Sequence, residues 1–360
     1  MVQTKLLAAT NWLSLSDLKK GNAPDNITEY ERNAIRFCQQ WLNGREEFEF
    51  LTSGSTGKPK IITFTRAQLV ASARLTERTL ELKAGYNALI CLDTNFIAGA
   101  MMLVRSLVTG MNIILRTPAA NPLLEIQERI DFAAFVPYQI ITLLEQSPLE
   151  LDKLKIVIIG GANLKDEVIN LLQSKSPSFY ATYGMTETIT HVALQKLNGL
   201  NRKDFFQLLP GISASTDDRG CITLHVPHLG DQAIITNDLV TLFDGNKFRW
   251  LGRYDRVINS GGVKVQAEKI EGTIDTIFQK LKIHKRFFVG GIPHQKLGEK
   301  VVLVLEGMKM DPLQEVSFKA QLAEHLNEHE MPKALLFIPQ FIETLTQKID
   351  RVRTMKLVNE

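Results

Sequence analysis

The stretch on which the interpretation of this chain depends reads Leu51-Thr52-Ser53-Gly54-Ser55-Thr56-Gly57-Lys58-Pro59-Lys60. Its two glycines allow a tight turn with exposed backbone N–H groups, and hydroxyl and ammonium groups surround them, so the loop could wrap a polyphosphate. A Walker A loop is excluded, because only two residues separate the glycines and Lys58 is followed by proline. By composition alone, a flexible Ser/Gly loop is an equally good interpretation.

The composition of the 360-residue chain is that of an ordinary globular protein, with 22% charged and 44% hydrophobic residues. A net charge of +3 gives no reason to expect nucleic acid as a partner. The three cysteines lie far apart, which predicts neither a zinc site nor disulfides, and Cys91 is expected in the core. Because we find no signal-peptide pattern and no apolar run of about 18 residues, we expect a cytoplasmic protein without membrane insertion.

Residues 88–175 alternate between apolar strand-like segments and helical patterns. We expect strands at 88–93, 112–116, 132–136 and 155–159, and helices at 99–108, 123–130, 139–146 and 164–175. Such an alternation predicts an α/β fold, in which helices cover both faces of a mostly parallel sheet.

The pattern changes after Gly199 to short alternating strands, expected at 221–226 and 232–236, and as a hairpin of 239–243 with 247–251. The chain becomes more charged after Arg256, with strands expected near 286–289 and 300–305 and a helix at 318–328. We therefore predict a large domain over residues 1–254 and a small α+β domain over 255–360, with the boundary at Asp255.

Two further motifs follow predicted strands, where α/β proteins bind ligands. In Tyr183-Gly184-Met185-Thr186-Glu187-Thr188, the tyrosine offers a stacking face, Thr186 a hydroxyl donor and Glu187 a hard oxygen ligand for Mg²⁺. Glu187 alone would equally suit a helix N-terminus. In Gly160-Gly161-Ala162, the small residues allow a flat ring to approach the backbone, although a simple tight turn explains them as well.

Two charged segments in the last third of the chain complete the set. The first is Gly252-Arg253-Tyr254-Asp255-Arg256-Val257-Ile258, followed by Gly261-Gly262-Val263-Lys264-Val265 and Glu268–Glu271, and the second is Thr346-Gln347-Lys348-Ile349-Asp350-Arg351 near the carboxyl end. Either segment could instead be a solvated charged surface. Together and in this order, the five segments resemble the adenylate-forming superfamily of acyl-CoA synthetases, carrier-protein adenylation domains and luciferases. They match its TSG[ST]TGxPK, YGxTE and GRxD motifs, and Thr236-Asn237-Asp238 resembles its TGD motif, with Asn237 in place of glycine. Gln347 stands where the family has a glycine before its late lysine.

The resemblance implies an acid–thiol ligase that uses ATP, Mg²⁺ and coenzyme A, and it implies a role for each matching residue. The residues that would contact the phosphates are Thr52, Ser53, Ser55, Thr56 and Lys60. Those that would enclose adenine are Gly160, Gly161, Ala162 and Tyr183, and those that would hold the ribose are Asp238 and Arg253. Thr186 would bind the α-phosphate, Glu187 the metal, and Lys348 would be catalytic. Asp255 would be the hinge of a mobile small domain.

The short region before the phosphate loop, and the segment Asn95–Gly99 followed by Arg105, resemble the o-succinylbenzoate–CoA ligases of menaquinone synthesis. This substrate has a second carboxylate, which needs a cation or strong donors when it is desolvated. Arg105, within an apolar helical pattern, is the favoured candidate, although it could instead extend to solvent. His191 is a second candidate, for which a structural role is favoured.

Two alternatives stay open at this point. The enzyme could activate another aromatic acid, or load a carrier protein instead of coenzyme A. The chain could also be a catalytically inactive nucleotide-binding regulator, which the presence of Lys348, Glu187 and Thr186 argues against.

Overall fold

A computed structural model describes residues 4–8, 11–51, 61–343 and 349–359. The helices are α1 (Leu15–Lys19), α2 (Glu29–Leu42), α3 (Arg66–Leu80), α4 (Ile97–Thr109), α5 (Pro137–Gln146), α6 (Pro148–Leu151), α7 (Asp166–Leu172), α8 (Ala267–Lys280), α9 (Pro312–His325) and α10 (Arg351–Asn359). The predicted phosphate-loop residues Thr52, Ser53, Ser55, Thr56 and Lys60, and the predicted catalytic Lys348, lie outside the described residues.

The described strands form two large sheets and one hairpin. They are β1 (Lys5–Ala8), β2 (Asn11–Ser14), β3 (Glu47–Leu51), β4 (Ile61–Thr65), β5 (Asn87–Ile90), β6 (Asn112–Leu115), β7 (Ile130–Phe135), β8 (Leu154–Ile159), β9 (Ser178–Gly184), β10 (His191–Lys196), β11 (Phe206–Leu208), β12 (Ser213–Thr216), β13 (Cys221–His225), β14 (Ile234–Phe243), β15 (Lys247–Arg253), β16 (Val257–Ser260), β17 (Val263–Gln266), β18 (Phe287–His294), β19 (Gly298–Glu306) and β20 (Ala334–Ile338). The hairpin, β3 with β4, flanks the predicted phosphate loop.

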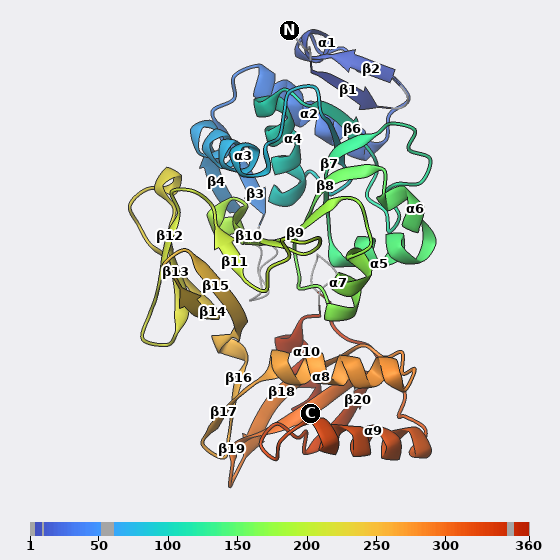
Figure 1. Ribbon diagram of the computed structural model, residues 1–360, viewed down its shortest axis with the longest axis vertical. Helices are drawn as coiled ribbons and strands as arrows, with labels where there is room; N and C mark the ends of the chain where they lie inside the picture. The colour runs from blue at the N-terminus through green and yellow to red at the C-terminus, as the bar shows by residue number, and fades with distance from the viewer. Residues whose placement is uncertain (1–3, 9–10, 52–60, 344–348, 360) are drawn as a thin grey trace.

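The first sheet has the strand order β12-β13-β14-β15-β11-β10-β9-β8-β7-β5-β6-β1-β2 (Figure 1). Its centre, from β1 through β6, β5, β7 and β8 to β9, pairs in parallel. From β9 to β12 every neighbouring pair is antiparallel. The predicted α/β fold is confirmed, and the parallel centre carries the helical connections that the sequence pattern indicated.

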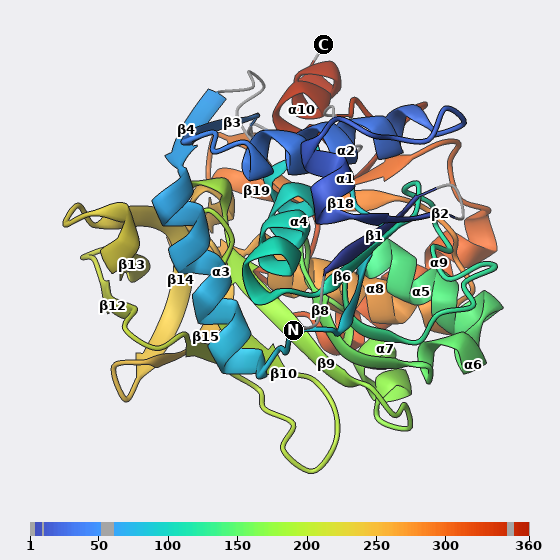
Figure 2. The ribbon, with the colours of Figure 1, turned by 90° about the horizontal axis from the view of Figure 1, so that it is seen from above.

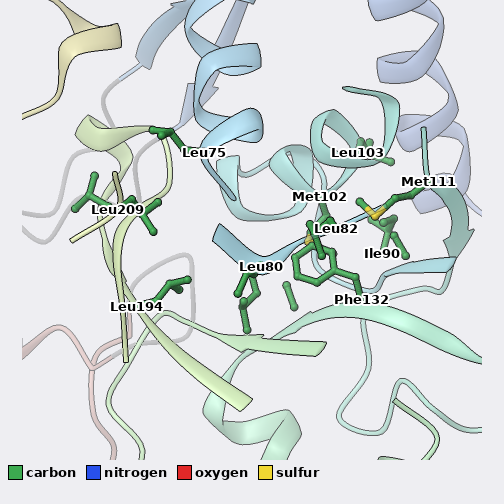
Figure 3. Packing of buried hydrophobic residues seen from close by; sticks show 14 of the residues in the cluster. Leu75, Leu80, Leu82, Ile90, Met102, Leu103, Met111, Phe132, Leu194 and Leu209 are labelled. Carbon is green, nitrogen blue, oxygen red and sulfur yellow. The ribbon is translucent and has the colours of Figure 1, made fainter. Parts of the chain in front are cut away.

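Both faces of the parallel centre are buried. Along β5, Ala88 and Ile90 belong to one apolar cluster, which includes residues of α2 and α4 (Figure 3). Leu89 belongs to a second cluster, with residues of α5 and α7. Because consecutive strand residues point to opposite faces, an unbroken apolar strand must be covered on both sides. Cys91, also in the second cluster, is buried as expected.

The helix predicted at 123–130 is wrong. The segment is a series of turns, in which the backbone N–H of Leu123 donates to Oδ1 of Asn121 at 3.2 Å and Glu125 has a φ of 61°. Leu123 and Ile126 are both buried, and their spacing of three imitates a helical stripe. The helix predicted at 318–328 exists as α9 but begins earlier, at Pro312, where Asp311 caps it.

The second sheet follows the 3₁₀-helix Tyr254–Arg256 and has the order β17-β16-β19-β18, with β20 parallel to β19. Helices α8 and α9 pack on one of its faces, and α10 on the other. It lies below the first sheet in Figure 1, and Figure 2 views both sheets from above. The division into two domains at Asp255 stays a prediction. No helix in the described part of the chain is long and apolar enough to cross a membrane.

Candidate active site

A cavity of about 300 Å³ opens at the carboxyl ends of the parallel strands. The chain leaving β5, the end of β7, the turn after β8 and the turn after β9 all border it, which is where a parallel α/β sheet presents ligands. Its walls are formed by Leu92, Phe96, Ile97, Ala98, Arg105, Ala134, Phe135, Val136, Ile158, Gly160, Gly161, Thr182, Gly184, Met185, Thr186, Ile189, Thr190 and His191. The predicted residues Arg105, Gly160, Gly161, Thr186 and His191 therefore share one cavity.

The turn from β9 into β10 shapes one wall. A Cβ on Gly184 would lie 2.4 Å from the carbonyl oxygen of Thr190, so only glycine allows this close approach. Ile189, fully buried, has φ 65° and ψ −59°, and Thr190 N–H donates to the Thr188 carbonyl at 2.7 Å. This γ-turn is costly for a β-branched residue. It sets the course of the chain that leads to Thr190 and His191.

Arg105 is 2% exposed, on the cavity wall formed by α4. Its Nη2 donates to Thr190 Oγ1 at 2.5 Å and its Nε to Thr76 Oγ1 at 3.3 Å, while Nη1 contacts Met102 Sδ at 3.7 Å. No acidic side chain pairs with it among the residues that the structure describes. Burial lowers the pKa of Arg105 to about 9, so the side chain stays a cation at neutral pH. The alternative that it extends to solvent is wrong.

His191 lies beside this guanidinium. Its Nε2 is 3.1 Å from Thr76 Oγ1 and its Nδ1 is 3.4 Å from Thr190 Oγ1. Burial, and then the charge of Arg105, hold the pKa of His191 well below its usual value, so the ring is neutral. The two threonine hydroxyls thus connect a neutral imidazole to a buried cation, and His191 both lines the cavity and supports Arg105.

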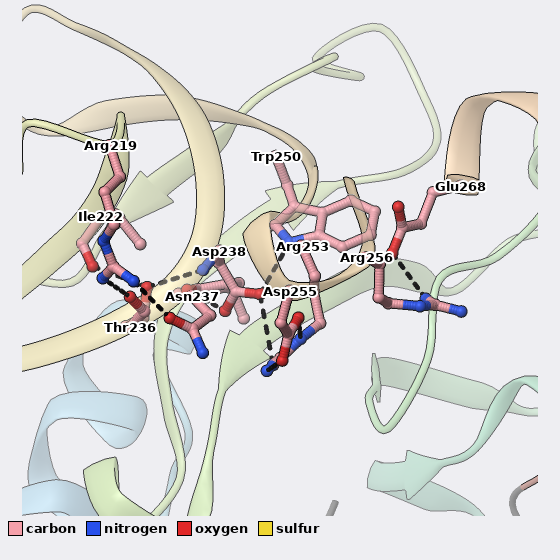
Figure 4. Close-up of polar contacts among 11 residues, drawn as sticks. Arg219, Ile222, Thr236, Asn237, Asp238, Trp250, Arg253, Asp255, Arg256 and Glu268 are labelled. Atoms are coloured by element: carbon pink, nitrogen blue, oxygen red, sulfur yellow. Dashed lines mark hydrogen bonds and ion pairs between the residues drawn. The ribbon is translucent and has the colours of Figure 1, made fainter. Parts of the chain in front are cut away.

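The predicted ribose residues are joined to the cavity strand through Tyr183. Its hydroxyl donates to Asp238 Oδ2 at 2.7 Å, and its ring packs edge-on against Phe248. Figure 4 shows the other partners of Asp238: Trp250 Nε1 at 3.3 Å and Arg253 Nη1 at 3.8 Å from Oδ1. Tyr183 is 9% exposed and is not among the residues that form the cavity wall, so its contact with adenine stays a prediction.

Asn237, which replaces the family glycine, has a partner of its own. Arg219 donates to Asn237 Oδ1 at 2.8 Å and to the Thr236 carbonyl at 2.9 Å (Figure 4). Its guanidinium also lies 5.1 Å from the centre of the Tyr254 ring. Arg219 therefore links Asn237, the residue in place of the family glycine on β14, to Tyr254, the residue before Asp255.

Asp255 and Arg253 form a two-bond ion pair, with N···O distances of 2.9 and 2.8 Å. The pair raises the pKa of Arg253 and lowers that of Asp255. It lies at the junction between the last strand of the first sheet and the second sheet, where the predicted hinge was placed. Both side chains are partly exposed, which leaves them accessible to a ligand as well as to each other.

Thr186 and Glu187 begin the short 3₁₀-helix Thr186–Thr188. Thr186 lines the cavity and Glu187 is exposed beside it, with no partner for its carboxylate in the described part of the chain. Mg²⁺ in nucleotide sites takes one or two protein carboxylates together with phosphate oxygens and water, so these residues fit a metal carried by ATP. Ala162 is exposed and lies just beyond the cavity wall.

The sequence interpretation missed four polar or aromatic groups at this site: Thr76, Thr182, Thr190 and Trp250. Thr182 Oγ1 donates to the Ile159 carbonyl at 3.1 Å and ties β9 to β8. Thr190 could have been found, because it lies only three residues after Glu187, the last residue of the YGxTE motif. Thr76, on α3, carries no local signal and reaches Arg105 only through the packing of α3 on α4.

Comparisons with known proteins identify the family and the fold of the chain. Residues 48–213 match the AMP-binding enzyme family. The solved structure of an acyl-CoA synthetase (AMP-forming)/AMP-acid ligase II-like protein from Dyadobacter fermentans is 40% identical, with a TM-score of 0.63 over 95% of this chain and 97% of that one. A 2-succinylbenzoate–CoA ligase of Lactococcus lactis is 23% identical over 91% of this chain and 77% of its own length. The Bacillus subtilis o-succinylbenzoate coenzyme A synthetase, solved with ATP and magnesium, superposes with a TM-score of 0.74 at 18% identity, over 85% of this chain and 69% of that one.

Proposed function

The chain belongs to the AMP-binding enzyme family of AMP-forming acid–CoA ligases, and from this premise we propose that it is an o-succinylbenzoate–CoA ligase of menaquinone synthesis. In this proposal MgATP and the acid form an acyl-adenylate and pyrophosphate, and the thiol of coenzyme A then displaces AMP. The protein would act in the cytoplasm on small molecules, because ATP and coenzyme A are its co-substrates.

The observation that carries the choice of acid is Arg105, a buried cation without a carboxylate partner in the described residues, on the wall of the cavity. A desolvated unpaired charge is unfavourable, and an anionic ligand group removes that penalty. o-Succinylbenzoate has one carboxylate to activate and another to pair with Arg105. The apolar side chains of Phe96, Ile97 and Phe135 suit its ring and methylene groups.

The parts of the bound MgATP would be held by different segments of the chain. Thr186 and Glu187 would face the α-phosphate and its metal, Gly160 and Gly161 the adenine, and Asp238 with Arg253 the ribose. The phosphate-loop residues and Lys348 would complete the charge neutralisation, which positions the acid carboxylate against the α-phosphorus. The metal supplies further neutralisation of phosphate charge when it is bound.

The thiol step would require a second arrangement. We propose that the small domain turns about Asp255, so that Lys348 leaves the phosphates and the Gly261–Gly262 turn borders the path of the thiol. The ion pair of Asp255 with Arg253 supports this proposal, because it is at the junction of the two sheets and partly exposed, where it can break and re-form.

The test is acid-dependent pyrophosphate release with a panel of acids: o-succinylbenzoate, benzoate, other substituted benzoates and fatty acids. The expected result is a kcat/KM for o-succinylbenzoate that exceeds the others by at least about 100-fold, on the scale of one buried charge pair. Omission of coenzyme A, with and without carrier proteins, separates the acceptor classes. Preference for a monocarboxylic acid would refute the proposed substrate, and no pyrophosphate release with any acid would favour the inactive regulator.

A further inference from the structure

Glu271 joins three elements that are distant in the sequence. On α8, its Oε1 and Oε2 accept from Nη1 and Nη2 of Arg351, the first residue of α10, and the Nη2 bond is 3.1 Å long. The same carboxylate lies 3.6 Å from Nη2 of Arg256, in the 3₁₀-helix that joins the two sheets. One partly buried side chain therefore contacts both the hinge segment and the base of the last helix.

The hinge side of this junction is closely packed. Arg256 Nη1 donates to Glu268 Oε1 at 2.6 Å, one helical turn before Glu271 (Figure 4). Gly252, with a φ of +145°, makes room for Glu268, since a Cβ at this position would lie 3.0 Å from Glu268 Oε2. A change of backbone conformation at Tyr254–Arg256 must therefore displace the first turns of α8 or break these contacts.

The tail side is equally well anchored. Glu343 pairs with Arg286 at 2.7 Å and forms a β-bridge with Ile349, so the chain ends on both sides of residues 344–348 lie together. Asp350 caps α10 by accepting from the Arg353 N–H at 3.0 Å. The Arg351 guanidinium lies 5.4 Å from the centre of the Phe288 ring. Arg351 is three residues after Lys348, and thus its position constrains where that segment returns to the fold.

We propose that Glu271 is a positioning residue, which couples the hinge at Asp255 to the segment carrying Lys348 through Arg256 and Arg351, and so supports adenylate formation more than thiol transfer. The inference rests on the proposed function, in which Lys348 serves the first half-reaction. Glu271 touches no reacting group; it acts on the placement of the chain.

The electrostatics of the junction are consistent with a positional role. Desolvation raises the pKa of Glu271 to about 7, against the opposing charge of Arg256 and the N–H of Val289. The charged groups that face it are Arg256 from the hinge, Arg351 from α10, and Glu268 and Asp275 on its own helix. Such partly buried ion pairs contribute little net stability, but two pairs on one carboxylate define the relative positions of three elements.

The test compares Glu271→Gln with Glu271→Asp and with a matched control, Lys269→Gln, which breaks an ion pair on the same helix (Lys269–Glu330, 2.6 Å). Two quantities are measured on the full chain: the rate of each half-reaction in single turnover, and amide hydrogen exchange over residues 342–354. Glu271→Gln is expected to slow acyl-adenylate formation about 10- to 100-fold and conversion of supplied acyl-adenylate to thioester less than about twofold. It should accelerate exchange at residues 349–354, Glu271→Asp should recover part of both, and Lys269→Gln should change neither.

Unchanged exchange over residues 349–354 in Glu271→Gln overturns the coupling, whatever the enzyme does. Faster exchange with equal loss in both half-reactions reduces Glu271 to a structural residue and also overturns the inference. If the unsubstituted protein forms no acyl-adenylate with any acid, the proposed function and the role in catalysis fail together, while the exchange data still decide whether Glu271 holds α10 in place.

Discussion

Replacing Arg105 by methionine tests the substrate proposal with two measurements, because it should raise the stability of the free enzyme and lower its activity on o-succinylbenzoate. The lowering of the pKa of Arg105 from its ordinary value to about 9 corresponds to about 5 kcal/mol for keeping the guanidinium charged without an anionic partner, an upper bound because the protein relaxes around the charge. Methionine has a similar length and matches the apolar surroundings of α4. Because apolar replacement of buried ion pairs has stabilised other proteins by about 1–4 kcal/mol, and Arg105 lacks even the compensation of an ion pair in the described part of the chain, Arg105→Met should raise the unfolding free energy of the free enzyme by a similar amount.

The pH dependence of this effect follows from the same shift. The folded-state pKa lies below the unfolded one, so the cost of the charge is fully present below about pH 9 and would diminish only above it. The stabilisation by methionine should therefore be constant between pH 6 and about 8.5. His191, held neutral by burial and by Arg105, should gain a higher pKa once the cation is removed, and NMR of the ring would report it.

Catalysis should respond in the other direction. Loss of the cation should lower kcat/KM for o-succinylbenzoate by about 2–4 kcal/mol, or roughly 30- to 1,000-fold, and should leave a monocarboxylic benzoate nearly unaffected. Chemical denaturation, together with kinetics on both acids, measures the two effects, and Arg74→Met, at an exposed arginine paired with Glu77, is the control. Unchanged o-succinylbenzoate kinetics in a stable Arg105→Met protein would refute the assignment, and a strongly destabilised variant would refute the description of Arg105 as an unpaired buried charge.

Three further outcomes are expected. Glu187→Gln should fold normally but need higher Mg²⁺ for adenylate formation, since an amide is a poorer ligand for a hard cation; an unaltered Mg²⁺ titration would exclude the metal role. Lys348→Ala should slow adenylate formation by about 3–4 kcal/mol and spare thioester formation from supplied acyl-adenylate, and equal loss in both would exclude domain alternation. Burial raises the pKa of Glu271 in the folded protein to about 7, above the ordinary 4.5. Ionisation of its carboxyl should therefore lower the free energy of unfolding by up to about 3 kcal/mol as the pH rises from about 4.5 to 7. Glu271→Gln should flatten this part of the plot of unfolding free energy against pH, measured by denaturation, and an unchanged plot would contradict the raised pKa.

The local sequence was sufficient for the family and for most strands of the parallel centre. The unbroken apolar segments at β5, β7 and β8 predict strands buried on both faces, and the two apolar clusters confirm it. The chemistry was implied by the resemblance of the five segments, in their order, to the adenylate-forming superfamily, since each segment alone left another interpretation open. The same reasoning failed at 123–130, where two buried residues three apart imitate a helix that an Asx turn and the positive φ of Glu125 exclude.

What the sequence by itself determined are the properties that reside in a few neighbouring residues: strand and turn segments, the order of motifs and the residue types that could bind phosphate. Only the tertiary structure decided that Arg105 is buried, that Thr76 from α3 and Thr190 from the β9–β10 turn are its partners, and that Tyr183 turns its hydroxyl to Asp238. These are contacts between elements far apart in the chain. The cost of an unpaired charge depends on how completely the surrounding elements exclude water, and no local pattern contains that information.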